Sequence, residues 1–138
     1  MEMGDDMAGY SGTPLEKKLG LRAGQRGYVA GAPPSLAALF APLALERALR
    51  GPLDYLHVFE TRRDALAAAL PELAAALDDA GMLWLSWPKK ASGRATTLDE
   101  RTVRELGLAA GLVDVKVCAV DEVWSGLKFV RRLKDRKK

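Results

Sequence analysis

Short apolar runs alternate along this chain with segments in which hydrophobic residues recur every three or four positions. Three runs of strand length, at 26–31, 54–59 and 82–87, are apolar nearly throughout, which is typical of strands covered on both faces of a sheet. Between the second and third runs, one helical face is formed by Leu66, Leu70, Leu73 and Leu77. The pattern therefore predicts parallel strands joined by helical crossovers.

Helix starts are predicted at four places. Three of them carry a threonine three residues before a carboxylate, a spacing at which the two side chains satisfy amide groups of the first helical turn. These patterns occupy 13–16, 61–64 and 97–100, and Ser35 supplies a fourth cap. The predicted helices run over 14–19, over 36–43, from 61 to a stop at Gly81, and from 97 to a stop at Gly111.

The last part of the chain predicts an antiparallel hairpin. Residues 113–119 alternate between apolar and polar side chains, and residues 127–133 follow too soon for a helical crossover. Strand, helix, strand, helix, strand, helix and hairpin together predict a three-layer α/β sandwich with right-handed crossovers. We expect a mostly parallel sheet of about five strands that closes with this C-terminal hairpin.

Length and composition fit a single domain. The 138 residues are 49% hydrophobic, which is enough to bury a core without a metal or a disulfide. We assign 13–133 to this domain, 1–12 to a flexible N-terminal segment and 134–138 to a basic C-terminal tail. Residues 131–138 hold six basic side chains and one acidic one, so they carry +5 of a formal net charge of +3 and leave −2 for the rest. We interpret this run as a frayed, solvated tail, with weak attraction to nucleic acid or anionic lipid as the alternative.

Several classes of protein are disfavoured by what the sequence lacks. Cys118 is the only cysteine and His57 the only histidine, so the sequence offers neither an intramolecular disulfide nor a cluster of zinc ligands. The first residues lack the basic start and apolar run of a signal peptide, and no later segment suits a membrane-spanning helix. We expect a cytoplasmic protein that binds no metal and no membrane. No specific nucleic acid is expected, because no aromatic residue is interleaved with the basic tail.

Four motifs carry a resemblance to known proteins, and they stand at 10–15 (YSGTPL), 87–93 (WPKKASG), 111–114 (GLVD) and 124–129 (WSGLKF). Together they resemble a bacterial family known only as a domain of unknown function, over nearly the whole chain. The order of the last strands resembles the carboxy-terminal half of Rossmann-like methyltransferases, over 26–133. The resemblance implies a Rossmann-like sandwich, and it implies no activity because the family has none assigned.

The methyltransferase resemblance also implies a cofactor site, which the residues here do not reproduce. In that fold a Gly-rich turn after the first strand lets backbone amides approach the methyl donor, and an acid at the end of the next strand holds the ribose. Here the turn at 30–34 (AGAPP) has one glycine and two prolines without amide hydrogens. Asp54 begins its strand instead of ending it, and Glu60 is an unsupported candidate. We expect the methyl-donor site to be lost, and the cofactor stays unknown.

Candidate ligand-binding residues gather where the predicted parallel strands end, because their carboxyl ends share one rim. The loop 89–97 brings cations, hydroxyl groups and a flexible glycine to the start of a helix, which are the ingredients of a site for a small anion. The alternative is an ordinary solvated loop that leads into a capped helix. The candidate residues are Pro33, Trp87, Lys89, Lys90, Ser92, Arg94 and Thr97.

Other chemistry-bearing residues are assigned to the core or to an interface. Trp84 and Trp87 stand three apart on a strand, so they point to opposite faces, and Trp87 either packs in the core or walls a pocket for a planar ligand. His57, in the middle of a strand, suits a packed core histidine better than a catalytic one, and Cys118 suits a buried hydrophobe. Either sheet edge could support self-association, and for Trp124 packing inside the monomer is favoured, with an interface role as the alternative. The interface candidates are Trp124, Leu127 and Phe129.

These features leave three functions open. The first is a small binding module that holds an anionic ligand at the carboxyl rim of the sheet. The second is a non-catalytic interaction or structural protein with a truncated methyltransferase-like fold that forms a homo-oligomer. The third is a methyltransferase-like enzyme with an altered cofactor site.

Overall fold

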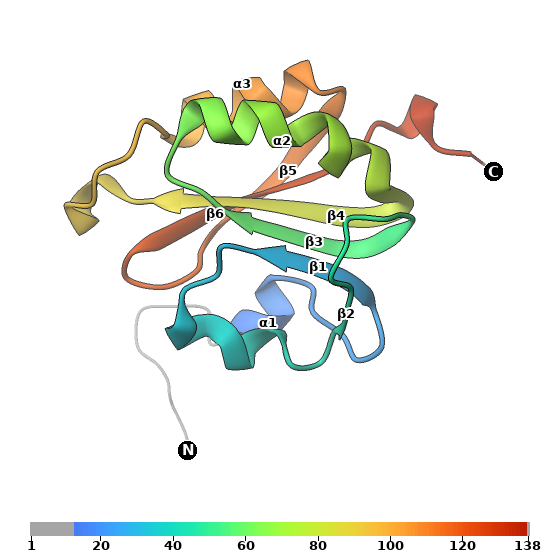
Figure 1. The fold of residues 1–138 in the computed structure, drawn as a ribbon, viewed down its shortest axis with the longest axis horizontal. Helices are drawn as coiled ribbons and strands as arrows, with labels where there is room; N and C mark the ends of the chain where they lie inside the picture. The colour runs from blue at the N-terminus through green and yellow to red at the C-terminus, as the bar shows by residue number, and fades with distance from the viewer. Residues whose placement is uncertain (1–12, 138) are drawn as a thin grey trace.

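Six strands form one mixed sheet in the computed structural model, which describes residues 13–137 (Figure 1). The strands are β1 (Arg26–Ala30), β2 (Ala44–Leu45), β3 (Leu53–Phe59), β4 (Leu77–Pro88), β5 (Leu112–Ala119) and β6 (Trp124–Arg131). Their order across the sheet is β2-β1-β3-β4-β6-β5. The pairs from β2 to β4 are parallel, whereas β6 is antiparallel to both β4 and β5. The predicted fold class is confirmed, with the short β2 as an additional strand.

Helical segments cover both faces of the sheet. The helices α2 (Arg63–Ala76) and α3 (Glu100–Ala109) lie on one face, and α1 (Leu15–Lys18) lies on the other with the 3-10 helix η1 (Pro34–Phe40) (Figure 1). Two shorter 3-10 turns are η2 (Lys90–Ser92) and η3 (Leu133–Asp135). Among residues 13–137, no helix has the length and apolar character needed to cross a membrane. The predicted flexible segment 1–12 lies outside the described residues.

The predicted helix over 36–43 is a 3-10 helix instead of an α-helix. Pro33 and Pro34 stand at its start and Pro42 follows its end. Proline lacks an amide hydrogen and clashes with the preceding turn, so these three residues leave too little chain for a regular α-helix. The last residue of this helix, Phe40, is buried against the sheet and contacts the rings of Tyr55, His57 and Phe59.

The predicted end of the second helix at Gly81 is wrong. α2 ends at Ala76, because Leu77 already pairs with Leu53 as the first residue of β4. The next pairing in this ladder joins Tyr55 to Met82, so residues 78–81 form an irregular bulge within the strand. A Cβ added at Gly81 would lie 2.7 Å from the backbone oxygen of Leu53. Glycine is therefore needed here for the close approach of two strands.

Two hydrophobic layers make up the core, one on each face of the sheet. The layer under α2 and α3 contains Trp87, Leu127 and Phe129, and the layer under α1 and η1 contains Trp84 and Trp124. Trp84 and Trp87 lie in different layers, which confirms the prediction made from their spacing. Trp87 is only 5% exposed, so it is a core residue and does not wall an open pocket.

The end of the chain is fastened to the domain, which differs from the predicted solvated tail. The amide of Lys137 donates to Asp79 Oδ2 at 2.8 Å, and Arg136 Nε donates to the carbonyl oxygen of Arg131 at 3.0 Å. The guanidinium of Arg131 donates in turn to the carbonyl oxygens of Ala74 and Leu77 at 2.7 and 2.6 Å. The Arg131 bonds tie β6 to backbone acceptors at the end of α2, where the carbonyl oxygen of Ala74 also accepts the amide of Leu77.

Gly107 tests the packing of α3 on the sheet. A Cβ added there would lie 2.0 Å from Cε2 of Phe129, a fully buried ring, so the helix or the ring must shift. We expect Gly107→Ala to lower the free energy of unfolding by about 1–3 kcal/mol, because overpacking outweighs the gain in helix propensity of up to about 1 kcal/mol. Chemical denaturation measures the change. Leu108→Ala, at the exposed neighbouring position, is the control and should change stability by less than about 0.5 kcal/mol. A more stable Gly107→Ala protein would contradict the packing argument.

Candidate functional site

The loops that follow β1, β3 and β4 share one rim of the sheet, as predicted. The three strands are parallel and in register near their ends, where Ala30 pairs with Val58 and Phe59 pairs with Ser86. The loop after β4 lies next to the turn between β3 and α2, and the amide of Thr97 donates to the carbonyl oxygen of Thr61 at 2.9 Å. The rim is therefore a real junction of segments that are distant in the sequence.

Lys89, the first cation of the loop, is engaged within the protein. Its ammonium group donates to the carbonyl oxygen of Asp121 at 2.7 Å, and its amide donates to the carbonyl oxygen of Val123 at 2.7 Å. Both acceptors lie in the turn between β5 and β6. Lys89 therefore holds the rim loop against the hairpin, and this contact competes with any ligand for its ammonium group.

The hydroxyl groups of the loop also bind within the protein. Ser92 Oγ donates to the carbonyl oxygen of Lys89 at 2.7 Å and accepts from the amide of Arg94. Thr96 Oγ1 donates to the carbonyl oxygen of Thr61 at 2.7 Å. Because these hydrogen bonds close the loop on itself and on its neighbour, they fix its shape and leave the loop hydroxyls fewer bonds to offer an anion.

Two helix starts at the rim differ from the predicted capping boxes. Thr97 Oγ1 accepts the amide of Arg63 at 2.7 Å, so Thr97 caps the start of α2 from a distant loop. The cap of α3 is Asp99, which accepts the amide of Thr102 at 2.8 Å. This bond lowers the pKa of Asp99, and the charge of nearby Lys90 lowers it further. The local threonine pattern misassigned both caps because it could not reveal contacts between loops.

Lys90 and Arg94 are the loop cations that remain available. Both are exposed, and neither side chain forms a hydrogen bond or an ion pair with any of residues 13–137. Gly93 lies between them in a left-handed conformation (φ 73°), with open space around its Cα. The rim thus presents two free cations on a loop whose shape is held by other groups.

Glu60 and Pro33 complete the predicted rim. Glu60 Oε2 accepts the amides of Thr61 at 2.9 Å and Arg62 at 3.1 Å, so this carboxylate satisfies the turn that leads into α2. Pro33 is half-buried and starts η1. Glu60 Oε2 is thus used within the protein, and Pro33 has no amide hydrogen to offer a ligand.

The turn after β1 does not fit a methyl donor. A Cβ added at Gly31 would lie 2.4 Å from the backbone oxygen of Phe59, so this glycine serves the close packing of β1 on β3. Pro33 and Pro34 lack amide hydrogens in the part of the turn where the donor would need them. The packing of Gly31 and the two prolines therefore give a physical reason to expect that the methyl-donor site is lost.

Glu46 is an acid that sequence reasoning missed, because the strand before it has only two residues. It follows β2, the second strand in chain order, and pairs with Arg26 at an Nε to Oε2 distance of 3.7 Å. In the ladder Leu45 pairs with Gly27, three residues before the end of β1. Glu46 therefore lies partway along the sheet and does not reach the rim.

His57 lies in a buried hydrogen-bonded chain. Its Nδ1 is 3.0 Å from the hydroxyl of Tyr55, and its Nε2 is 2.7 Å from Ser86 Oγ. All three residues are 2% exposed or less. Burial lowers the pKa of His57 to about 3, so the ring is neutral and its two nitrogens are satisfied. The serine and histidine have no access to substrate, which agrees with the predicted core histidine.

The remaining candidates are also buried. Trp124, Leu127 and Phe129 are 6%, 0% and 0% exposed, so they pack inside the monomer, as favoured for Trp124, and do not form the candidate interface patch. Cys118 is buried, and burial raises the pKa of its thiol. Residues 13–137 contain no group of three or more His, Cys, Asp or Glu side chains that could hold a metal ion.

A family model described as "Protein of unknown function (DUF3052)" matches residues 56–133. No curated protein matches the chain in sequence. The chain is similar in structure to a SAM-dependent methyltransferase from Aquifex aeolicus, with a TM-score of 0.63 and 15% identity over 82% of this chain and 85% of that one. It is also similar to the magnesium protoporphyrin IX methyltransferase of Synechocystis PCC 6803 with bound SAM (TM-score 0.58, 13% identity, 86% and 74% of the chains). Both predicted resemblances are confirmed, and at these identities the structural likeness concerns the fold alone.

The neutral state of His57 predicts how stability depends on pH. The folded pKa of about 3 lies below the ordinary value of 6.5, so the unfolded chain takes up a proton first as the pH falls. The stabilisation is complete above pH 6.5 and is lost progressively below it. We expect the free energy of unfolding to be about 1.4 kcal/mol lower at pH 5.5 than at pH 7.5. Urea denaturation of the wild type and of His57→Gln checks this, because the variant should lose the pH dependence in this range. An equal dependence in both proteins would assign it to other groups.

Proposed function

Because the chain belongs to DUF3052, a family of proteins of unknown function, we propose a function from its geometry: a small binding module that holds an anionic ligand at the carboxyl rim of the sheet. The observation that carries the proposal is the pair of unpaired cations, Lys90 and Arg94, on the rim loop. Lys89, Ser92 and Thr97 hold this loop in place and do not bind the ligand directly.

A preformed loop favours binding because little conformational entropy is lost when the ligand arrives. The loop is anchored to the hairpin by Lys89 and to the start of α2 by Thr96 and Thr97. Two cations on such a support can both donate charge-assisted hydrogen bonds to one anionic group, and these bonds are about twice as strong as neutral ones. The rim is also the edge at which open α/β sheets usually bind their ligands.

Methyl transfer is the less supported alternative. One of the similar structures contains SAM, but the turn after β1 in this chain is packed against Phe59 and interrupted by two prolines. The other alternative is an interaction protein that forms a homo-oligomer through a sheet edge. The residues first assigned to that interface are buried, which lowers its support.

The packed turn predicts that the methyl donor does not stabilise the protein. With S-adenosylmethionine or S-adenosylhomocysteine at 1 mM, the midpoint of thermal unfolding should stay unchanged. A ligand present at a hundredfold excess over its dissociation constant would instead add about 2.7 kcal/mol to the free energy of unfolding. A clear rise with either compound would show that the altered turn still accepts the donor and would favour the enzyme alternative.

The rim proposal predicts that pyrophosphate binds and that reversing Lys90 and Arg94 weakens it. Each charge-assisted hydrogen bond contributes about 1.5–3 kcal/mol, so Lys90→Glu and Arg94→Glu should each raise the dissociation constant by about tenfold or more. Isothermal titration calorimetry measures the constants. Lys134→Glu changes the net charge equally at an exposed residue of η3 and is the matched control. If the control and the rim variants weaken binding equally, the effect comes from net charge and the rim site is excluded.

A further inference from the structure

A pocket lies at the amino edge of the sheet, opposite the rim. It has a volume of about 520 Å³ and lies between the segment after α1 and the strands β4 and β6. Its position separates it from the rim, because Met82 is near the start of the regular part of β4 whereas Lys89 follows the end of that strand. The lining residues are Lys17, Gly20, Leu21, Arg22, Met82 and Lys128.

The charges around this pocket are all positive. Lys17, Arg22 and Lys128 contribute to its wall, and no carboxylate does. None of the three forms an ion pair with another residue in the part of the chain that the structure describes. Three cations at one hollow, without an internal counter-charge, are suited to an anionic ligand.

The strand pairing places a further positive charge next to Lys128. Lys128 lies directly opposite Lys116 in the antiparallel ladder of β5 and β6, and like charges at such positions are destabilising. Lys116 cannot turn away freely, because its ammonium group donates to the carbonyl oxygen of Lys18 at 2.8 Å. The pKa of Lys128 is lowered by burial and then by the charges of Lys116 and Arg22. A bound anion would relieve this repulsion, which no described carboxylate does.

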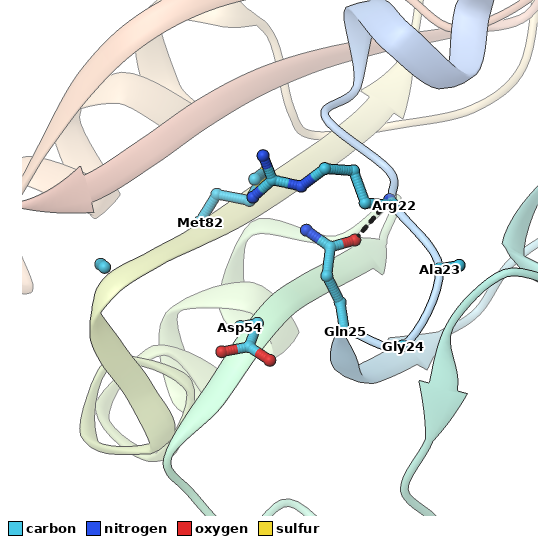
Figure 2. A pocket seen from close by; sticks show the side chains of 7 residues that line it. Arg22, Ala23, Gly24, Gln25, Asp54 and Met82 are labelled. Carbon is cyan, nitrogen blue, oxygen red and sulfur yellow. Dashed lines mark hydrogen bonds between the residues drawn. The ribbon is translucent and has the colours of Figure 1, made fainter.

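The segment that carries Arg22 is held in place. The indole Nε1 of the buried Trp84 donates to the carbonyl oxygen of Leu19 at 3.0 Å. Gln25 Nε2 donates to the carbonyl oxygen of Gly20 at 3.1 Å, and its Oε1 accepts the amide of Arg22 at 2.7 Å (Figure 2). Arg22 thus projects from an ordered turn, so its backbone is in place before a ligand arrives.

One wall of the pocket is apolar. Leu21 and Met82 line it, and Gly20 (φ 75°) lies so close to Met82 that an added Cβ would be 2.9 Å from its sulfur atom. Figure 2 shows the neighbouring hollow, which shares Arg22 and Met82 with this pocket and is also lined by Gln25 and Asp54. Asp54, which faces the neighbouring hollow, accepts the amide of Arg26 at 2.9 Å. The acid is thus engaged outside the cationic pocket.

We propose that the pocket at the amino edge binds a phosphate monoester with an apolar body. The dianionic phosphate lies between Arg22 and Lys128, where cations converge, and the body lies on Leu21 and Met82. Methionine suits such a contact because its flexible, polarisable side chain adapts to varied apolar shapes. The pocket has the volume of ordinary small-molecule sites, which range from about 300 to 1,000 Å³. This site is distinct from the rim and stands whether or not the rim binds an anion.

Isothermal titration calorimetry with three probes tests both halves of the site. The probes are 1-naphthyl phosphate, inorganic phosphate and 1-naphthol, which carry the whole ligand, its head and its body. We expect 1-naphthyl phosphate to bind at least about tenfold more tightly than either of the others, because only it uses both walls. If inorganic phosphate bound as tightly as 1-naphthyl phosphate, the proposed contact of the apolar body would be wrong. If 1-naphthol bound as tightly as 1-naphthyl phosphate, the proposed contact of the phosphate group with the cations would be wrong.

Variants locate the site and separate it from the rim. Arg22→Gln and Lys128→Gln should each raise the dissociation constant of 1-naphthyl phosphate by about tenfold. Lys128→Gln should also raise the midpoint of thermal unfolding without ligand, because it removes the repulsion from Lys116, so weaker binding cannot be attributed to misfolding. Lys134→Gln, at an exposed residue of η3, is the matched control and should leave this affinity unchanged, whereas Lys90→Gln distinguishes this pocket from the rim. Loss of binding in Lys90→Gln alone would place the ligand at the rim, which overturns this inference and keeps the proposed function. Binding to Lys128→Gln as tight as to the wild type overturns this inference in any case.

Discussion

Strand β4 is the constraint on which the rest of the structure depends. It pairs in parallel with β3 on one side and antiparallel with β6 on the other, and its residues from Leu83 to Trp87 are buried on both faces. Every other element is placed relative to it, because a central strand must satisfy two ladders of hydrogen bonds at once. The rim loop begins where β4 ends, and Met82 near its start lines the pocket at the opposite edge. Both candidate sites therefore lie at the two ends of β4.

The buried polar groups explain why chemistry is confined to the edges. Inside the sheet, Tyr55, His57 and Ser86 satisfy one another, and the indole of Trp84 finds a backbone acceptor. A satisfied network in a low-dielectric core stabilises a single arrangement, whereas opening it to substrate would leave unpaired groups. The sheet edges differ, since they hold cations that form no ion pair with a described carboxylate. Unpaired charged groups are thus separated from the hydrogen-bonded core groups by their location in the fold.

Long, strongly patterned segments could be predicted from the sequence, and contacts between distant segments could not. The nearly continuous apolar character of β3 and β4 was sufficient to place them in the sheet, and the alternation before Cys118 was sufficient for the hairpin. β2 was missed because two residues carry no periodicity. The meeting of the loops after the parallel strands at one rim was predicted from the sequence. The contacts of Lys89 and Thr97 were not, because they bind backbone groups of segments more than 30 residues away. The pocket at the amino edge was missed because the pairing of Lys116 with Lys128 depends on a strand register that no local pattern reveals.

The comparison with methyltransferases concerns how a fold can keep its sheet and change its site. The fold here is similar to that of a methyltransferase, yet Gly31 serves a contact with Phe59 and the 3-10 helix η1 follows β1. A turn that packs tightly cannot also admit a ligand, because the same backbone atoms would have to meet both. The two acids nearest to such a site, Glu46 and Glu60, are bound to groups of the chain itself. Unpaired charge persists instead at Lys90 and Arg94 on one edge and at Arg22 and Lys128 on the other. Because like-charged and unpaired groups cost stability unless something offsets them, these two edges are where a binding function is best supported.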